Sequence, residues 1–116
     1  MRVCAIDNTS FGMAVKSTPE AKSYLVERLR HKHALKLEKL IESAQNDSVD
    51  VNLSTRESYL YIGMHKASPY TKLIVKVGNE DACEPEGMSF FILRAIKKAV
   101  NRAHTLSENQ KALNNL

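Results

Sequence analysis

The hydrophobic period changes twice along the chain, and this change constrains the fold more than any other feature. Apolar residues recur at helical spacing from about residue 18 to 45, alternate with polar residues from 49 to 77, and return to helical spacing from 88 to 104. Helical spacing indicates a helix with one buried face, and alternation indicates strands with one buried face. The pattern therefore predicts helices packed against a sheet.

The first helical segment has a clear start. Ser17 and Thr18 offer a hydroxyl cap, Pro19 suits a first turn, and Glu20 complements the free amides there. The expected helix runs to about residue 45. Its apolar stripe comprises Val26, Leu29, His33, Leu37, Leu40 and Ala44, with Leu25 and Ile41 flanking it. On this stripe His33 is expected to be buried with one hydrogen-bond partner, so that its protonation destabilises the packing.

Three alternating runs predict a meander of strands. They cover residues 49–53, 60–64 and 73–77, with turns expected at 54–57 and 67–69. Shorter runs at 2–7 and 11–16, separated by turn-forming residues, predict an N-terminal hairpin.

The complete order is β-β-α-β-β-β-α once the second helix, at about 88–104, is included. It predicts the α+β class, with an antiparallel sheet and two helices packed on one of its faces. A single domain is expected over residues 1–106, followed by a polar tail over 107–116.

Composition limits the classes of function. No apolar run approaches the about 18 residues of a membrane span, and the first residues enter a strand-like run directly, so a cytoplasmic protein without membrane contact is expected. Cys4 and Cys83 lack the spacing of a disulfide framework or zinc site. The four glycines form no nucleotide-binding motif, and nucleophiles and histidines form no paired arrangement. Neither an enzyme nor a cofactor nor a metal is therefore expected.

Positive charge is concentrated on the helices. The net charge is +4, and an acidic cluster occurs at residues 80–86. The basic residues fall along one edge of the first helix and on the outward face of the second, where they could neutralise phosphates. The predicted anion-binding residues on the helices are Arg28, Lys32, Lys36, Lys39, Arg94, Lys97, Lys98 and Arg102.

The exposed face of the expected sheet is a second candidate surface for nucleic acid. Tyr59 and Tyr61 could stack on bases, while Lys72 and Lys76 could contact phosphates. The alternative is that the tyrosines pack against the N-terminal hairpin or a second subunit.

Phe90 and Phe91 lie off the apolar stripe of the second helix. At least one of them is expected to be exposed next to Arg94 and Lys97, where it would form an interface. The alternative is that the preceding loop covers both rings.

The order α-β-β-β-α over residues 18–104 resembles the topology of double-stranded-RNA-binding domains. In that family the last helix opens with a lysine-rich phosphate clamp, whereas residues 84–91 here are acidic and apolar. The resemblance is therefore one of element order.

The N-terminal residues 3–15 resemble the strand, aspartate, turn and strand that open the resolvase branch of RNase H-like nucleases. That resemblance implies a divalent metal held by Asp7, with Asp81, Glu84 and Glu86 as the other candidate carboxylates.

Three functions follow, in order of support. The first is a non-enzymatic binding or regulatory protein that engages an anionic partner, with nucleic acid or a nucleotide first, through the basic helix residues. The second is a protein-interaction module or inhibitor that acts as a homo-oligomer. The third is a metal-dependent nuclease centred on Asp7.

Overall fold

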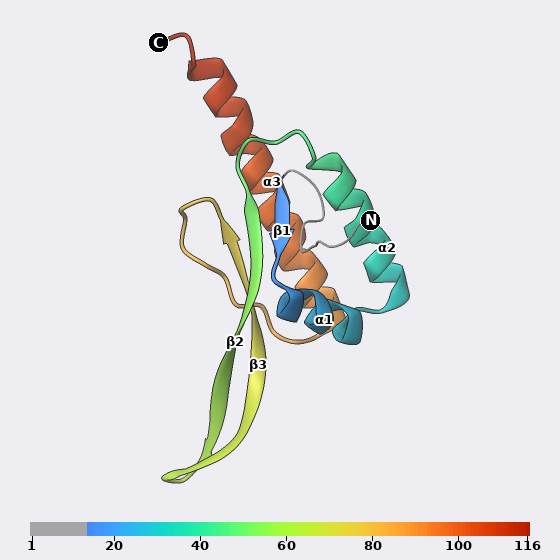
Figure 1. Cartoon of the computed structure of the whole chain (residues 1–116), viewed down its shortest axis with the longest axis vertical. Helices are drawn as coiled ribbons and strands as arrows, with labels where there is room; N and C mark the ends of the chain where they lie inside the picture. The colour runs from blue at the N-terminus through green and yellow to red at the C-terminus, as the bar shows by residue number, and fades with distance from the viewer. Residues whose placement is uncertain (1–13) are drawn as a thin grey trace.

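The computed structural model describes residues 14–116 (Figure 1). Cys4 and Asp7 lie outside these residues. The predicted N-terminal hairpin also lies outside them, except for residues 14–16. Six elements follow in the order β-α-α-β-β-α: β1 (Val15–Ser17), α1 (Pro19–Arg28), α2 (His31–Ser43), β2 (Val51–Ile62), β3 (His65–Val77) and α3 (Ser89–Leu113). The α+β class is confirmed.

Helix α1 begins where the capping residues predict it. The Thr18 hydroxyl accepts a hydrogen bond from the Ala21 N–H at 3.1 Å, with Pro19 in the first turn and Glu20 beside the free amides. This start depends only on adjacent residues, which is why the sequence reveals it.

The single long helix predicted up to residue 45 is wrong, because the chain breaks at Leu29 and Arg30. Both residues adopt extended backbone angles, and α2 restarts at His31. The Arg30 N–H donates to the Ser89 hydroxyl on α3 at 2.9 Å. The break shifts the helical phase, so Val26 is exposed while Tyr24 and Leu25 are buried.

The sheet is mixed, which corrects the antiparallel prediction. Its strand order is β1-β2-β3, with β1 parallel to β2 and β2 antiparallel to β3. The two helices between β1 and β2 return the chain to its starting end of the sheet, so β2 runs in the direction of β1.

Two long strands replace the three predicted after α2, so the order resembling a double-stranded-RNA-binding domain does not form. Residues 54–57 and 67–69, predicted as turns, lie within β2 and β3. The chain reverses instead at Gly63 and Met64, where Gly63 has a φ of +63°. Positive φ at the first position of a two-residue turn favours glycine.

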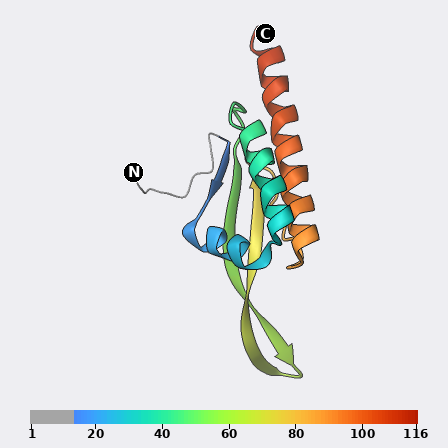
Figure 2. The ribbon, with the colours of Figure 1, turned by 90° about the vertical axis from the view of Figure 1, so that its right-hand side faces the viewer.

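The core lies between the sheet and the helices. Val51, Leu53, Leu73 and Val75 face Ile92 and Ile96 of α3, all of them buried. Figure 2 shows α2 and α3 side by side on one side of the sheet. In the described part of the chain, no helix is both long and apolar enough to cross a membrane.

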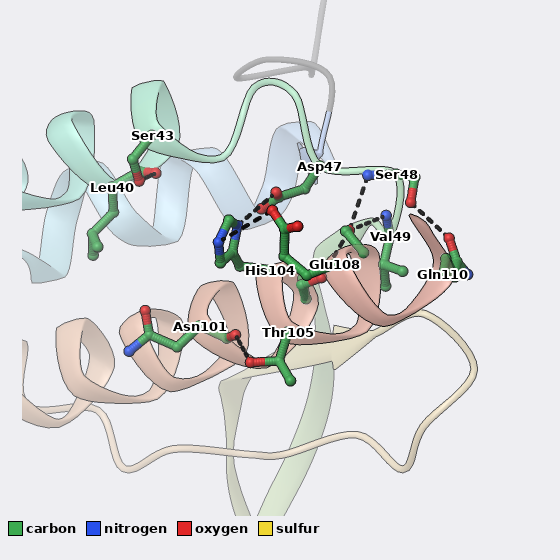
Figure 3. A network of polar contacts seen from close by, with 12 residues as sticks. Leu40, Ser43, Asp47, Ser48, Val49, Asn101, His104, Thr105, Glu108 and Gln110 are labelled. Atoms are coloured by element: carbon green, nitrogen blue, oxygen red, sulfur yellow. Dashed lines mark hydrogen bonds and ion pairs between the residues drawn. The ribbon is translucent and has the colours of Figure 1, made fainter. Parts of the chain in front are cut away.

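Helix α3 continues to Leu113 rather than ending near residue 104. Its C-terminal half holds the segment that joins α2 to β2, as Figure 3 shows. The Ser48 hydroxyl donates to Gln110 at 2.7 Å, and His104 Nδ1 lies 3.0 Å from Asp47 Oδ1. Ser107 is buried within the expected tail, so at least its first turn belongs to the packed structure.

Candidate anion-binding groove

A groove of about 510 Å³ lies between α2 and α3. Leu40, Leu93 and Phe90 form its apolar part. Four basic residues complete its lining: Lys36, Lys39, Arg94 and Lys97. The groove thus combines an apolar floor with four positive charges contributed by two helices.

Helical spacing explains why these four residues meet. Lys36 and Lys39 are three apart on α2, and Arg94 and Lys97 are three apart on α3, so each pair occupies one side of its helix. The two helices pack directly against each other. The predicted basic residues of both helices are therefore brought together in part.

The four groove cations have no carboxylate partner among the described residues. The ion pairs of the described chain involve other bases: Lys16, Arg56, Lys72, Arg102 and His104. An unpaired cation can bind an external anion without first breaking an internal ion pair. These four positions can therefore contact phosphate without losing an ion pair, and they line the same groove.

The acidic loop before α3 neutralises two of the other predicted cations. Glu80 accepts hydrogen bonds from Nε and Nη2 of Arg102, and Nη2 lies 2.8 Å from Oε2. Glu84 accepts hydrogen bonds from Nε and Nη2 of Arg56 and from Nζ of Lys72. The hydrogen bonds from Arg102 and from Arg56 hold the pKa of Glu80 and of Glu84, respectively, below the usual value.

At one end of the groove, an exposed ring lies next to a buried histidine. Phe90 is 56% exposed, and its ring centroid is 6.5 Å from that of His33. His33 is buried and its Nδ1 is hydrogen-bonded to the Ser89 hydroxyl, as its place on the stripe predicted. Desolvation lowers the pKa of His33, and the charges of Lys32, Lys36 and Arg30 lower it further.

Several predicted residues lie elsewhere. Arg28 belongs to α1, where its guanidinium stacks 4.9 Å from the Tyr24 ring centroid. Lys32 and Lys98 are exposed on α2 and α3 but do not line the groove. The break between the helices therefore divides the ridge that a single helix would have formed.

The predicted face of tyrosines and lysines does not form a single surface. Strand pairing places Asn52 opposite Lys76 and Arg56 opposite Lys72, whereas Tyr59 and Tyr61 lie at alternate positions, on the other face of β2. Lys66 instead covers the Tyr59 ring, with Nζ 3.5 Å from the centroid.

Phe90 and Phe91 are both at least partly exposed, at 56% and 38%, with ring centroids 5.7 Å apart. The expected exposure next to Arg94 and Lys97 is thus observed for Phe90, which shares the groove with them. Leu40, which the helical pattern places on the core stripe, also forms part of the groove floor, and no sequence signal indicates this second role.

A second groove, of about 450 Å³, lies between α1 and α2. Its floor is also apolar and includes Leu25 and Ile41, but Glu38 and Glu42 line its rim. These carboxylates oppose the approach of an anion, so this groove is the weaker candidate.

The nuclease alternative depends on Asp7, which lies outside the described residues. Within residues 14–116, no group of three or more histidine, cysteine, aspartate or glutamate side chains could hold a metal ion.

No family model, curated protein or solved structure matches the chain. Function is therefore inferred from the geometry of the groove.

Proposed function

We propose that this protein is a non-enzymatic nucleic-acid-binding protein that holds a single strand in the groove between α2 and α3. In this role Lys36, Lys39, Arg94 and Lys97 contact phosphates. The observation that carries the proposal is that four unpaired cations surround one apolar floor.

The apolar floor favours a single strand over a duplex. A duplex keeps its bases stacked and would offer the groove mainly phosphates, which need no apolar surface. An unpaired base can stack on an exposed ring while its backbone follows nearby cations. Phe90 supplies such a ring within the same groove.

The test compares two charge reversals of equal size. The groove variant carries Lys36→Glu and Arg94→Glu, and the control variant carries Lys22→Glu and Lys111→Glu, at exposed positions away from the groove. Fluorescence anisotropy with labelled single-stranded and double-stranded DNA and RNA measures the affinity of each across a range of salt concentrations.

The groove variant is expected to bind more weakly and with less dependence on salt. Each phosphate contact on a single strand contributes about 0.7 to the slope of log affinity against log salt, so losing two contacts lowers the slope by about 1.4. The control is expected to retain the wild-type slope. Absence of binding at low salt, or equal losses in both variants, would contradict the proposal.

Phe90→Ala separates stacking from charge. Loss of one base–ring contact is expected to reduce single-strand affinity by about 1–3 kcal/mol without changing the salt slope. Met88→Ala is the matched control, because Met88 is 63% exposed, comparable to Phe90, but does not line the groove. A Phe90→Ala variant with wild-type affinity would contradict base stacking and indicate that the groove binds phosphates alone.

The nuclease alternative centred on Asp7 stays a prediction.

A further inference from the structure

Residues 58–69 of the β2–β3 hairpin form an arm that projects away from the helices (Figures 1 and 2). The body of the protein ends just before it: α1 reaches residues 55–57, and the loop before α3 reaches residues 70–72. Large apolar side chains on the arm are exposed: Tyr59, Leu60, Tyr61, Ile62 and Met64. Because an isolated two-stranded ribbon is marginally stable in water, these side chains point to a covering partner.

The two long edges of the arm differ. On the β3 edge, Lys66 and Pro69 oppose pairing with another strand. Tyr59 pairs with Pro69 and Tyr61 with Lys66, so two residues of β3 lie opposite Leu60 and form a bulge on that edge.

The β2 edge carries no such protection. Strand β1 pairs only with residues 51–53, so no described strand covers residues 58–62. This stretch is Ser-Tyr-Leu-Tyr-Ile, which is rich in strand-forming residues and contains neither a charge nor a proline. It presents unpaired backbone donors and acceptors to a further strand.

We infer that the β2 edge at residues 58–62 pairs with the same edge of a second copy of this chain. Antiparallel pairing centred on Leu60 requires only one self-complementary edge, as two-fold symmetric dimers do. In that register Tyr59 of each copy lies opposite Tyr61 of the other, an aromatic pair that stabilises neighbouring strands.

The absence of charge on residues 58–62 of the arm allows a second copy to be the occupant. Elsewhere two copies would repel each other, because the chain carries a net charge of +4 and its groove is lined by cations. Residues 58–65 contain no aspartate, glutamate, lysine or arginine, so two copies can meet there without opposing like charges. The same neutrality gives a nucleic acid little attraction to this part of the arm.

The experiment measures molar mass by light scattering across a concentration series. The wild-type mass is expected to rise from 13.0 kDa toward twice that value. Ile62→Lys is expected to remain at the monomer mass, because a lysine on an edge strand opposes pairing with another strand. Val26→Lys is the matched control, since Val26 on α1 is also 75% exposed, and it is expected to dimerise as the wild type does.

Cross-linking tests the register. In a background where both native cysteines are serine, Leu60→Cys is expected to form a disulfide-linked dimer on mild oxidation, and Val26→Cys is not. A wild-type mass that stays at 13.0 kDa overturns the proposal and leaves a different molecule as the occupant. Dimerisation that Ile62→Lys does not weaken overturns it as well. Neither result depends on the groove, because nucleic-acid binding is measured separately.

Discussion

At the scale of single residues, Ser107 stabilises the junction between α2 and β2. Its hydroxyl accepts the N–H of Ser48 at 3.0 Å and of Val49 at 3.1 Å, and donates to the Ala103 carbonyl at 2.8 Å. The residue is 1% exposed, so water cannot replace these bonds without local opening.

Ser107→Ala is expected to lower the free energy of unfolding by about 1–3 kcal/mol, because it leaves backbone donors without an acceptor. Urea unfolding monitored by circular dichroism measures the loss. Ser23→Ala, at an exposed position on α1, is the control and should change stability little. Equal stability of the two variants would show that water satisfies the freed amides.

His33 makes stability depend on pH. Desolvation, aided by the charges of Lys32, Lys36 and Arg30, lowers the pKa of His33 below its ordinary value of 6.5. The unfolded chain therefore binds a proton at a higher pH than the folded chain does. The contribution of neutral His33 is present above pH 6.5 and decreases as the pH falls from there toward the folded-state pKa.

Unfolding midpoints in urea on either side of pH 6.5 test this sign. The wild type is expected to lose more stability on acidification than His33→Gln, which cannot titrate. His65→Gln, on the exposed arm, should retain the wild-type dependence. A His33→Gln variant with an unchanged pH dependence would assign the effect to other groups.

At the scale of elements, the β2–β3 hairpin has two parts of unequal stability. Its base pairs buried residues such as Leu53 with Val75, whereas the arm buries little. Amides of the arm in the monomer are therefore expected to exchange with solvent at least about tenfold faster than those of the base, a difference of about 1.4 kcal/mol in opening free energy.

Hydrogen exchange resolved by residue measures this gradient. The monomeric Ile62→Lys variant provides the reference, because pairing between copies would protect the wild-type arm. Uniform protection along both strands in that variant would contradict the division of the hairpin.

Local signals predicted the elements well where local interactions determine them. Thr18 and Pro19 announce the start of α1 because the cap lies within one turn. The break at Leu29 and Arg30 has no glycine or proline to announce it. The Arg30 N–H donates to Ser89, which is distant in sequence, so only the folded chain reveals this contact.

The sequence pattern predicted the buried ends of β2 and β3 as strands. It predicted turns at residues 54–57 and 67–69, which the structure shows to be strand. Residues 54–57 and 67–69 are polar or contain Pro69, which is typical of turns, yet they lie in strands that are largely open to solvent. The basic groove was also predictable only in part, because part of it depends on local spacing and part on tertiary contacts. Helical spacing places Lys36 with Lys39 and Arg94 with Lys97, but the neutralisation of Arg102 by Glu80 requires tertiary contact.

At the scale of the whole molecule, the basic groove and the apolar arm are formed by different elements. The acidic loop neutralises cations of the sheet and of α3, which leaves unpaired positive charge at the groove between α2 and α3. The arm is nearly uncharged and lies at one end of a molecule 57 Å long. Binding at the groove and self-pairing at the arm thus use different surfaces and can be removed independently by mutation.

The parallel pairing of β1 with β2 also has a consequence for the order of folding. Ile62 meets His65 across a two-residue turn, whereas Val15 meets Val51 only after two helices have intervened. Closing the longer loop costs more entropy, so we expect the hairpin to form first and β1 to dock later. In that interval the β2 edge is open along its whole length, including residues that β1 will cover. Pairing between chains at this open edge during folding is therefore expected to increase with the concentration of newly made chains.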